Sequence, residues 1–227
     1  MPGLGTKHAH GNETREFILA TAERLFAEHG VAAVSNRQIS EAAGQANNSA
    51  VAYHFGSKTD LVLAIVRRHV PAIERRRAEM LAKIGDSTDL RDWLACLVLP
   101  HTEHLASLGS PSWYARFIAQ ATTDPVLRQL VIDETVSSAS MHGVIEGLTR
   151  IIPVLPKEVH QEREDMSRLL IVHMCAERER ALHEGTATPR ATWDAIAVGL
   201  VDALVGLWEA AFTPTKSPQR KRLRKCE

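Results

Sequence analysis

Residues 35–58 constrain the fold more than any other stretch, because they predict two short helices joined by a tight turn. Their sequence is SNRQISEAAGQANNSAVAYHFGSK. Ser35, followed three residues later by Gln38, forms a capping box that starts one helix, and Gly44 ends it. The next segment carries small and polar side chains and then Tyr53-His54-Phe55. Such a surface can press against a phosphate backbone and reach base edges, although a piece of an ordinary helical bundle can have the same composition.

The rest of the chain is also predicted to be helical. Strand-like alternation is absent, and caps, Gly and Pro divide the sequence into segments. Pro71 predicts a kink or break, and the pairs Ser110-Pro111, Asp124-Pro125 and Thr188-Pro189 each predict a helix start. We expect an all-α fold with helices over residues 13–29, 35–44, 49–55, 58–70, 72–84, 88–107, 111–122, 125–150, 157–184 and 190–212.

Charge is distributed unevenly along a chain whose formal net charge is zero. The segment 71–214 is acidic, and the last 13 residues carry six Lys and Arg against one Glu. This balance excludes a protein coated in positive charge but allows a local DNA-binding face. The three cysteines are too few and too scattered for a disulfide framework, which fits a cytoplasmic protein. Neither a signal sequence nor a membrane span is predicted.

The order of features near the N-terminus favours a helix-turn-helix unit over a piece of bundle. Residues 13–70, about a quarter of the chain, resemble the DNA-binding domain of the tetracycline-repressor (TetR) family of bacterial transcription regulators. The matching positions are Ile18-Leu19, Ala22, Leu25-Phe26 and Gly30, then Ile39-Ser40 and Ala42-Ala43-Gly44, then Tyr53-His54-Phe55, Ser57-Lys58 and Leu61.

The resemblance implies a three-helix DNA-binding domain followed by a helical ligand-binding and dimerisation bundle. The expected boundaries are a disordered N-terminus (1–12), the helix-turn-helix domain (13–57), the bundle (58–212, with 58–70 as the linking helix) and a basic disordered tail (213–227).

The chain departs from the family pattern in the turn before the recognition helix. Between Gly44 and Phe55 it is one residue longer than usual, and Ala52 replaces the usual aromatic residue. A longer turn would shift the register at which the helix enters the major groove.

The candidate DNA contacts lie in and around this turn. An Asn at position 47 or 48 can pair with adenine in bidentate fashion, or it can cap the following helix. Val51 is expected to point into the core, and the Ala52 methyl could touch a thymine methyl. The hydroxyl of Tyr53 is expected to contact phosphate, as are the side chains at 54 and 58. The full set is Arg37, Asn47, Asn48, Ser49, Ala52, Tyr53, His54 and Lys58.

The last two long helices carry a candidate dimer interface. Small residues recur every four positions at Ala191, Ala195, Gly199 and Ala203, and small residues allow another helix to approach closely. The resemblance favours a homodimer with a four-helix interface, although packing within the chain would produce the same pattern. The candidate residues are Ile171, Met174, Cys175, Ala195, Gly199, Leu200, Ala203, Leu204, Gly206 and Leu207.

Bulky and polar side chains in the central helices could line an effector pocket. Each could equally belong to an ordinary core. The candidates are Trp93, His104, Trp113, Tyr114, Phe117, Met141, His142, Val144 and His173. The resemblance implies a ligand-responsive repressor that binds a palindromic DNA operator as a dimer and is released by a small apolar or amphipathic effector. Activation is a minority outcome in the family.

Other classes of function find less support in the sequence. His101 and His104 could share one helix face and hold a metal, but the spacing implies no third ligand. Motifs of common hydrolases, nucleotide-binding enzymes and zinc proteases are absent, so no catalytic residue, metal or cofactor is predicted. A helical protein-interaction adaptor is the other alternative, in which the basic segment Arg220–Lys225 would bind a partner. That segment could also add nonspecific DNA affinity or remain solvated.

Overall fold

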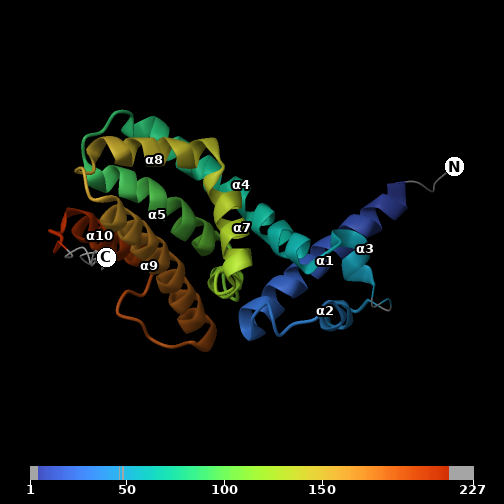
Figure 1. The fold of residues 1–227 in the computed structure, drawn as a ribbon. Coiled ribbons are helices and arrows are strands. Elements are labelled where there is room, and N and C mark those ends of the chain that lie inside the picture. The colour runs from blue at the N-terminus through green and yellow to red at the C-terminus, as the bar shows by residue number, and fades with distance from the viewer. Residues whose placement is uncertain (1–4, 46, 48, 215–227) are drawn as a thin grey trace, which may run out of the picture.

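The computed structural model describes residues 5–45, 47 and 49–214, and for residues 5–10 only the path of the backbone. This part of the chain folds into helices without strands, which confirms the all-α prediction. In chain order they are α1 (Gly5–His29), α2 (Asn36–Ala42), α3 (Ala50–Phe55), α4 (Lys58–Ile84), α5 (Leu90–Ser107), α6 (Tyr114–Ala121), α7 (Pro125–Val136), α8 (Ala139–Ile151), α9 (Lys157–Glu184) and α10 (Trp193–Glu209). Helices α1–α3 lie at one end of the molecule, and α4 runs from them into the remaining helices (Figure 1). We call α1–α3 the reading head and α5–α10 the body.

The helices of the reading head are capped by residues next to them in sequence. The side chain of Ser35 accepts a hydrogen bond from the Gln38 amide, and Gln38 bonds back to the Ser35 amide at 2.8 Å. Ser57 and Asp60 form the same reciprocal pair at the start of α4. The predicted capping box at Ser35 is therefore confirmed, and a second one starts α4.

Helix α4 continues through Pro71, so the predicted break at this residue is wrong. A proline removes one backbone hydrogen bond and crowds the preceding turn, which usually kinks a helix. Here α4 packs against α5, α7 and α8 as well as against the head. Packing along its length outweighs the local cost, and the reading head and the body share one long helix.

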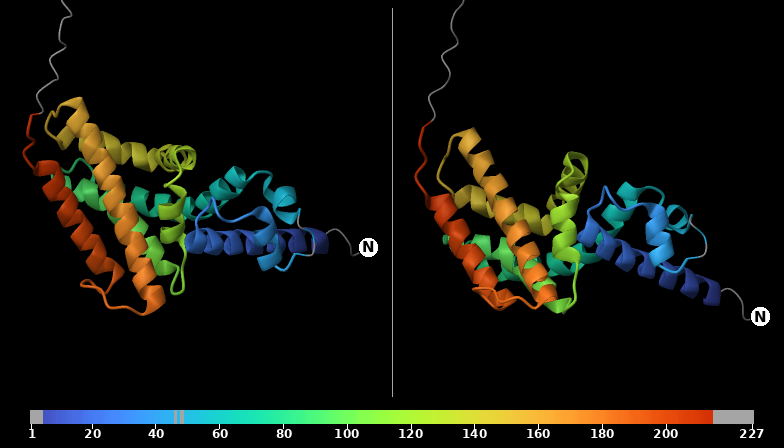
Figure 2. Two further views of the ribbon diagram at one scale, coloured as in Figure 1. Left: turned by 60° about the horizontal axis from the view of Figure 1, so that its bottom comes forward. Right: turned by 90° about the horizontal axis from the view of Figure 1, so that it is seen from below.

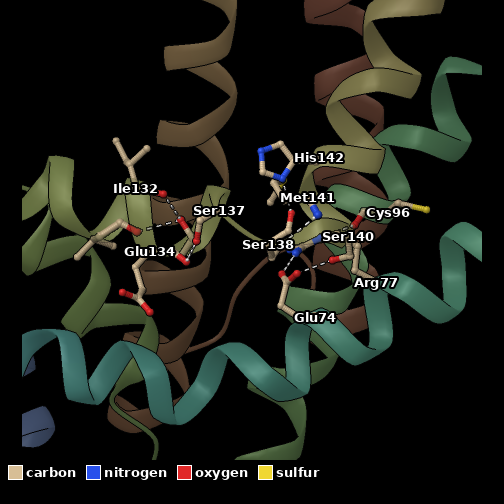
Figure 3. Close-up of polar contacts among 12 residues, drawn as sticks. Glu74, Arg77, Cys96, Ile132, Glu134, Ser137, Ser138, Ser140, Met141 and His142 are labelled. Carbon is tan, nitrogen blue, oxygen red and sulfur yellow. Dashed lines mark hydrogen bonds and ion pairs between the residues drawn. The ribbon is translucent and has the colours of Figure 1, made fainter.

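The predicted helix over 125–150 is two helices, α7 and α8, separated at Ser137-Ser138. The Ser138 hydroxyl accepts from the Met141 amide at 3.1 Å and so caps α8, while the Ser137 hydroxyl donates to the Glu134 carbonyl at 3.2 Å (Figure 3). Serine side chains compete for backbone partners in this way and stop helices. The start of α7 was predicted correctly, because Asp124 accepts from two amides of its first turn.

Three predicted helix starts differ from the structure. Helix α1 begins at Gly5, where the sequence predicted an unstructured segment up to residue 12. Helix α10 begins at Trp193 with Thr192 as its cap, and the hydroxyl of Thr188 instead accepts from Arg178 at 2.8 Å. Helix α6 begins at Tyr114, three residues beyond Pro111.

The start of α6 is set by a side chain from α9. The carboxylate of Glu179 accepts from the amides of Ala115 at 3.2 Å and Arg116 at 2.9 Å. It also accepts from the hydroxyl of Ser112 at 2.9 Å and from the Arg116 guanidinium at 3.3 Å. Glu179 is 1% exposed, so a buried carboxylate stabilises the positive end of this helix dipole.

The reading head rests on the body through aromatic side chains. Phe26 of α1 stacks on Phe117 of α6, with ring centroids 6.2 Å apart. Helices α9 and α10 lie side by side at the far end of the body from the N-terminus (Figure 2). Helix α10 also packs on α5.

Candidate nucleic-acid interface

Helix α3 divides its side chains between the core and solvent. Val51 is fully buried and Phe55 is 9% exposed, so both face the core of the head. Tyr53 is 85% exposed, Ala52 is exposed and His54 is half-buried. An aromatic side chain with a hydroxyl is thus held out from a short, rigid helix, which suits contact with a nucleic acid backbone.

The turn before α3 is organised by Asn47. Its side-chain oxygen accepts from the amide of Ser49 at 2.9 Å and from the Ser49 hydroxyl at 2.6 Å. These bonds occupy the oxygen that a bidentate pair with adenine would need. The Asn47 side chain thus closes the turn before α3, whose cap residue Ser49 makes no side-chain cap bond, and DNA would have to compete with Ser49 for it. Asn48 lies outside the described residues.

The cations predicted to contact DNA have partners within the chain. Arg37 pairs with Glu41 at 2.7 Å, and this hydrogen bond raises the pKa of the Arg37 guanidinium. The Lys58 ammonium donates to the carbonyl of Val31 at 3.1 Å and is half-buried. A carboxylate thus compensates the charge of Arg37, whereas Lys58 keeps its charge because its partner is a neutral carbonyl.

The N-terminus of α4 is less open to phosphate than the sequence indicated. The Asp60 carboxylate accepts from the amide of Ser57 at 3.1 Å and from its hydroxyl at 2.6 Å. Both hydrogen bonds lower the pKa of Asp60, and the bond from the Ser57 hydroxyl has the larger effect. The carboxylate is therefore charged at neutral pH. A phosphate at this helix end would meet that negative charge.

Arg15 of α1 is a cation near α3 that the sequence analysis did not identify. Its guanidinium lies 4.9 Å from the centre of the Phe55 ring. It is half-buried and pairs with Glu16 at 3.3 Å. No local pattern signals this contact, because it depends on how α1 crosses α3.

The candidate pocket residues do not gather around one cavity. Two of the candidates, His104 and Tyr114, lie together near the head, because both contact His69. The ring of Trp113 lies 4.7 Å from that of His183 and is tilted by 58° to it, and the Trp93 indole donates to the Ser87 carbonyl at 2.9 Å. Phe117 and Val144 are buried, Met141 is half-buried, and His142 and His173 are exposed.

Two open hollows mark the described surface. One, of about 670 Å³, lies between the end of α4, the start of α5 and helix α8, with Trp93 and Ile145 in its lining. The other, of about 460 Å³, lies between head and body and is lined by Lys58, Gln120 and Val126 among others.

Several candidate dimer residues face the interior of the chain itself. Of the ten, Ile171, Cys175, Leu200 and Leu204 are buried, whereas Met174, Ala203 and Gly206 are exposed. Ala195, Gly199 and Leu207 are half-buried. Other apolar side chains on the same two helices are exposed and were missed: Met166, Leu169 and Val198.

Buried titratable groups are concentrated in the body. Burial raises the pKa of Cys96 to about 11 and of Cys175 to about 12, so both thiols stay protonated. Burial also lowers the pKa of His101 and of His104 to about 4. Within the described ranges, His, Cys, Asp and Glu side chains form no group of three suited to a metal ion. The helices described there include none that is both long and apolar enough to cross a membrane.

A short exposed helix that follows a capped helix and a tight turn, carried on a three-helix head, defines a helix-turn-helix DNA-binding protein. Residues 18–65 match the family model described as bacterial regulatory proteins, tetR family. Residues 18–65 are therefore similar to the DNA-binding domain of TetR-family transcription regulators.

Three curated relatives share this similarity, all described as HTH-type transcriptional repressor AcnR. The protein from Corynebacterium glutamicum is 28% identical over 148 residues, which cover 60% of this chain and 69% of that protein. The protein from Corynebacterium diphtheriae is 37% identical over 81 residues, 36% of this chain and 40% of its own length. The protein from Corynebacterium efficiens is 32% identical over 87 residues, 36% of this chain and 46% of its own length. The last two are thus matched over less than half their length.

Proposed function

We propose that this protein is a cytoplasmic repressor that binds a palindromic DNA operator as a homodimer. The observation that carries the proposal is the exposed side chain of Tyr53 on α3, held out from a helix that Val51 and Phe55 anchor in the core. The names of the matched relatives support repression over activation. The Tyr53 hydroxyl, His54 and Lys58 contact phosphate, and the turn at Asn47 and Ser49 reads bases.

The dimer is proposed to form through the exposed apolar side chains of α9 and α10. Met166, Leu169 and Met174 are each more than 40% exposed on α9, and Val198 is 53% exposed on α10. Apolar side chains on adjacent helices mark a protein contact surface, and a second copy would cover them in a four-helix interface. Gly206, which has open space beside it, would allow the two copies of α10 to approach closely, whereas Arg190 of the same chain lies against Gly199.

The effector is proposed to be a small apolar or amphipathic molecule that binds the body. The hollow of about 670 Å³ beside Trp93 and Ile145 is large enough for such a molecule. Binding there would favour an arrangement in which the two heads are wrongly spaced for successive major grooves, and this would reduce operator affinity.

Binding to the DNA directly upstream of the protein's own coding region tests the proposal. Fluorescence anisotropy at several salt concentrations measures affinity and its salt dependence. Tyr53→Phe is expected to weaken binding to all sequences, roughly 3- to 10-fold for one hydrogen bond. Lys58→Ala is expected to reduce the slope of log affinity against log salt by about 1. Asn47→Ala is expected to relax sequence preference.

Lys83→Ala is the matched control, because Lys83 is an exposed lysine at the other end of α4 from the reading head. It should leave DNA affinity unchanged. Circular dichroism confirms that each variant is folded. Unchanged affinity, salt dependence and specificity in all three head variants would refute the assignment, and a monomer by light scattering at micromolar concentration would refute the dimer.

A further inference from the structure

Three side chains form a hydrogen-bonded chain from the reading head to the body. Nε2 of His69, on α4, lies 3.0 Å from Oε2 of Glu23, on α1. Nδ1 of the same ring lies 2.8 Å from Nε2 of His104, on α5. Glu23 is 6% exposed and His69 is 4% exposed, so solvent cannot replace either bond. The chain therefore joins three helices at the point where the head meets the body.

A carboxylate only accepts, so Nε2 of His69 donates to Glu23. Nδ1 of His69 and Nε2 of His104 then share one proton, and which of the two nitrogens donates depends on the tautomers of the rings. Burial lowers the pKa of His104 to about 4, which keeps His104 neutral at physiological pH.

Neighbouring side chains contact this hydrogen-bonded chain of Glu23, His69 and His104 on two sides. The Tyr114 ring of α6 stacks on His69, with ring centroids 3.8 Å apart. The guanidinium of Arg68 lies 3.9 Å from the Glu23 carboxylate on the other side. Phe26 and Phe117 stack close by, one turn after Glu23 on α1 and one turn after Tyr114 on α6. These contacts leave little freedom for α1 to turn against the body.

A shift of α1 away from α4 would break the bond between Glu23 and His69 and leave a buried carboxylate without its imidazole partner. An unpaired buried charge is strongly destabilising, whereas surface ion pairs can break at little cost. Other links between α4 and the body, such as Arg67 with Glu134 and Arg76 with Glu103, involve more exposed side chains and do not touch α1.

We propose that Glu23, His69 and His104 are positioning residues that hold the reading head at the angle required for operator binding. The proposal rests on the function proposed above, since it assigns the chain to that activity. The three residues touch no DNA, and they act by limiting the orientations of α3 relative to the dimer.

The test compares three variants of the full-length protein. His104→Phe keeps a ring of similar size but removes the hydrogen-bond partner of His69. His104→Gln restores an amide that can donate or accept near the position of Nε2, and it serves as the rescue. Arg76→Ala is the matched control, because it removes another link from α4 to α5 at Glu103, the neighbour of His104 in sequence. Glu23→Met removes the acceptor and replaces His104→Phe if that variant does not fold.

Two readouts separate positioning from general damage. Anisotropy measures affinity for the upstream DNA fragment and for an unrelated fragment of equal length. Double electron–electron resonance measures the distance between two spin labels, one on each head of the dimer. The labels are attached at Ala20→Cys, an exposed position on α1, in a Cys226→Ser background.

His104→Phe is expected to lose specific affinity roughly 5- to 30-fold, with little change for the unrelated fragment, and to broaden the distance distribution. His104→Gln and Arg76→Ala should resemble the parent protein in both readouts. Folded His104→Phe or Glu23→Met protein with the parent's specific affinity and distance distribution would overturn the proposal. Failure of the parent protein itself to bind the upstream fragment specifically would instead overturn the proposed function, and the positioning role with it.

Discussion

The reading head and the body differ in one helix cap. In the head, Ser35 and Gln38 cap α2 from within one turn of the sequence. In the body, local residues cap α5, α7, α8 and α10, but α6 is capped by Glu179, which lies 64 residues after Ala115. A local cap is visible in a short sequence window and is independent of the tertiary fold. A distant cap exists only once α6 and α9 have packed, so it ties the boundary of one helix to the stability of the whole body.

The largest expected effect is the loss of the distant cap. Glu179→Ala leaves Arg116 buried and removes the acceptor for two amides, so we expect the free energy of unfolding to fall by about 3–5 kcal/mol. Urea denaturation followed by circular dichroism measures the change. Glu177→Ala is the control, because Glu177 is an exposed carboxylate on the same helix that pairs with Arg180 at 3.6 Å. A loss below about 1 kcal/mol for Glu179→Ala would show that the body does not depend on this contact.

A fall in pH is expected to lower the free energy of unfolding by an intermediate amount, through His101 in the body. Burial, followed by the charge of Arg77 and the neighbouring His104 and His69, lowers the pKa of His101 to about 4. The ordinary value is about 6.5, so the unfolded chain binds more protons between these two values. Stability contributed by neutral His101 is therefore complete above pH 6.5 and is lost as pH falls toward 4.

The expected loss from His101 between pH 7 and pH 5 is about 2 kcal/mol. His101→Phe keeps an aromatic ring that cannot titrate. Between pH 7 and pH 5, the free energy of unfolding of this variant should therefore fall by about 2 kcal/mol less than that of the parent protein. Urea denaturation of both proteins at both pH values measures the difference and cancels the other titrating groups. Equal pH dependence in the two proteins would contradict a buried, neutral His101.

The smallest expected effect is the loss of a local cap in the reading head. Ser35→Ala removes the acceptor for the Gln38 amide, so stability should fall by about 1 kcal/mol. Hydrogen exchange should show faster opening of α2, with the amides of α9 unaffected. Ser107→Ala is the control, since that exposed hydroxyl only donates to the His104 carbonyl near the end of α5. Equal exchange changes in α2 and α9 would mean that the head cap is coupled to the body after all.

The sequence predicted those helix boundaries that depend on neighbours in the chain. The starts of α2, α4 and α7 follow from Ser35, Ser57 and Asp124, and α9 spans the predicted residues 157–184. At Pro71 and at the start of α6 the errors occurred where distant packing competes with local preference, whereas the break between α7 and α8 follows from local serine side chains. Pro71 stays inside α4 because three body helices pack on that helix. The start of α6 could not be predicted, because no local residue near Pro111 identifies Glu179 as its cap.

More of the candidate site could be predicted from the sequence in the head than in the body. In the head, the sequence was enough to predict that Val51 points into the core and that Tyr53 is available for DNA. Phe55 is buried as well. In the body, composition identified bulky and small residues without their directions. Leu200 and Leu204 therefore entered the predicted dimer surface although they are buried within the chain, and the exposed Met166 and Leu169 were missed.

By itself the sequence determined the class of the protein and the surface that can meet DNA. Capping boxes, glycine turns and the Tyr53-His54-Phe55 segment act over a few residues, so their consequences can be read locally. The tertiary structure decided which polar groups are buried together: Glu23 with His69 and His104, and Glu179 with the start of α6. Those pairs form between helices far apart in sequence, and their strength comes from the exclusion of water, which only the packed fold provides.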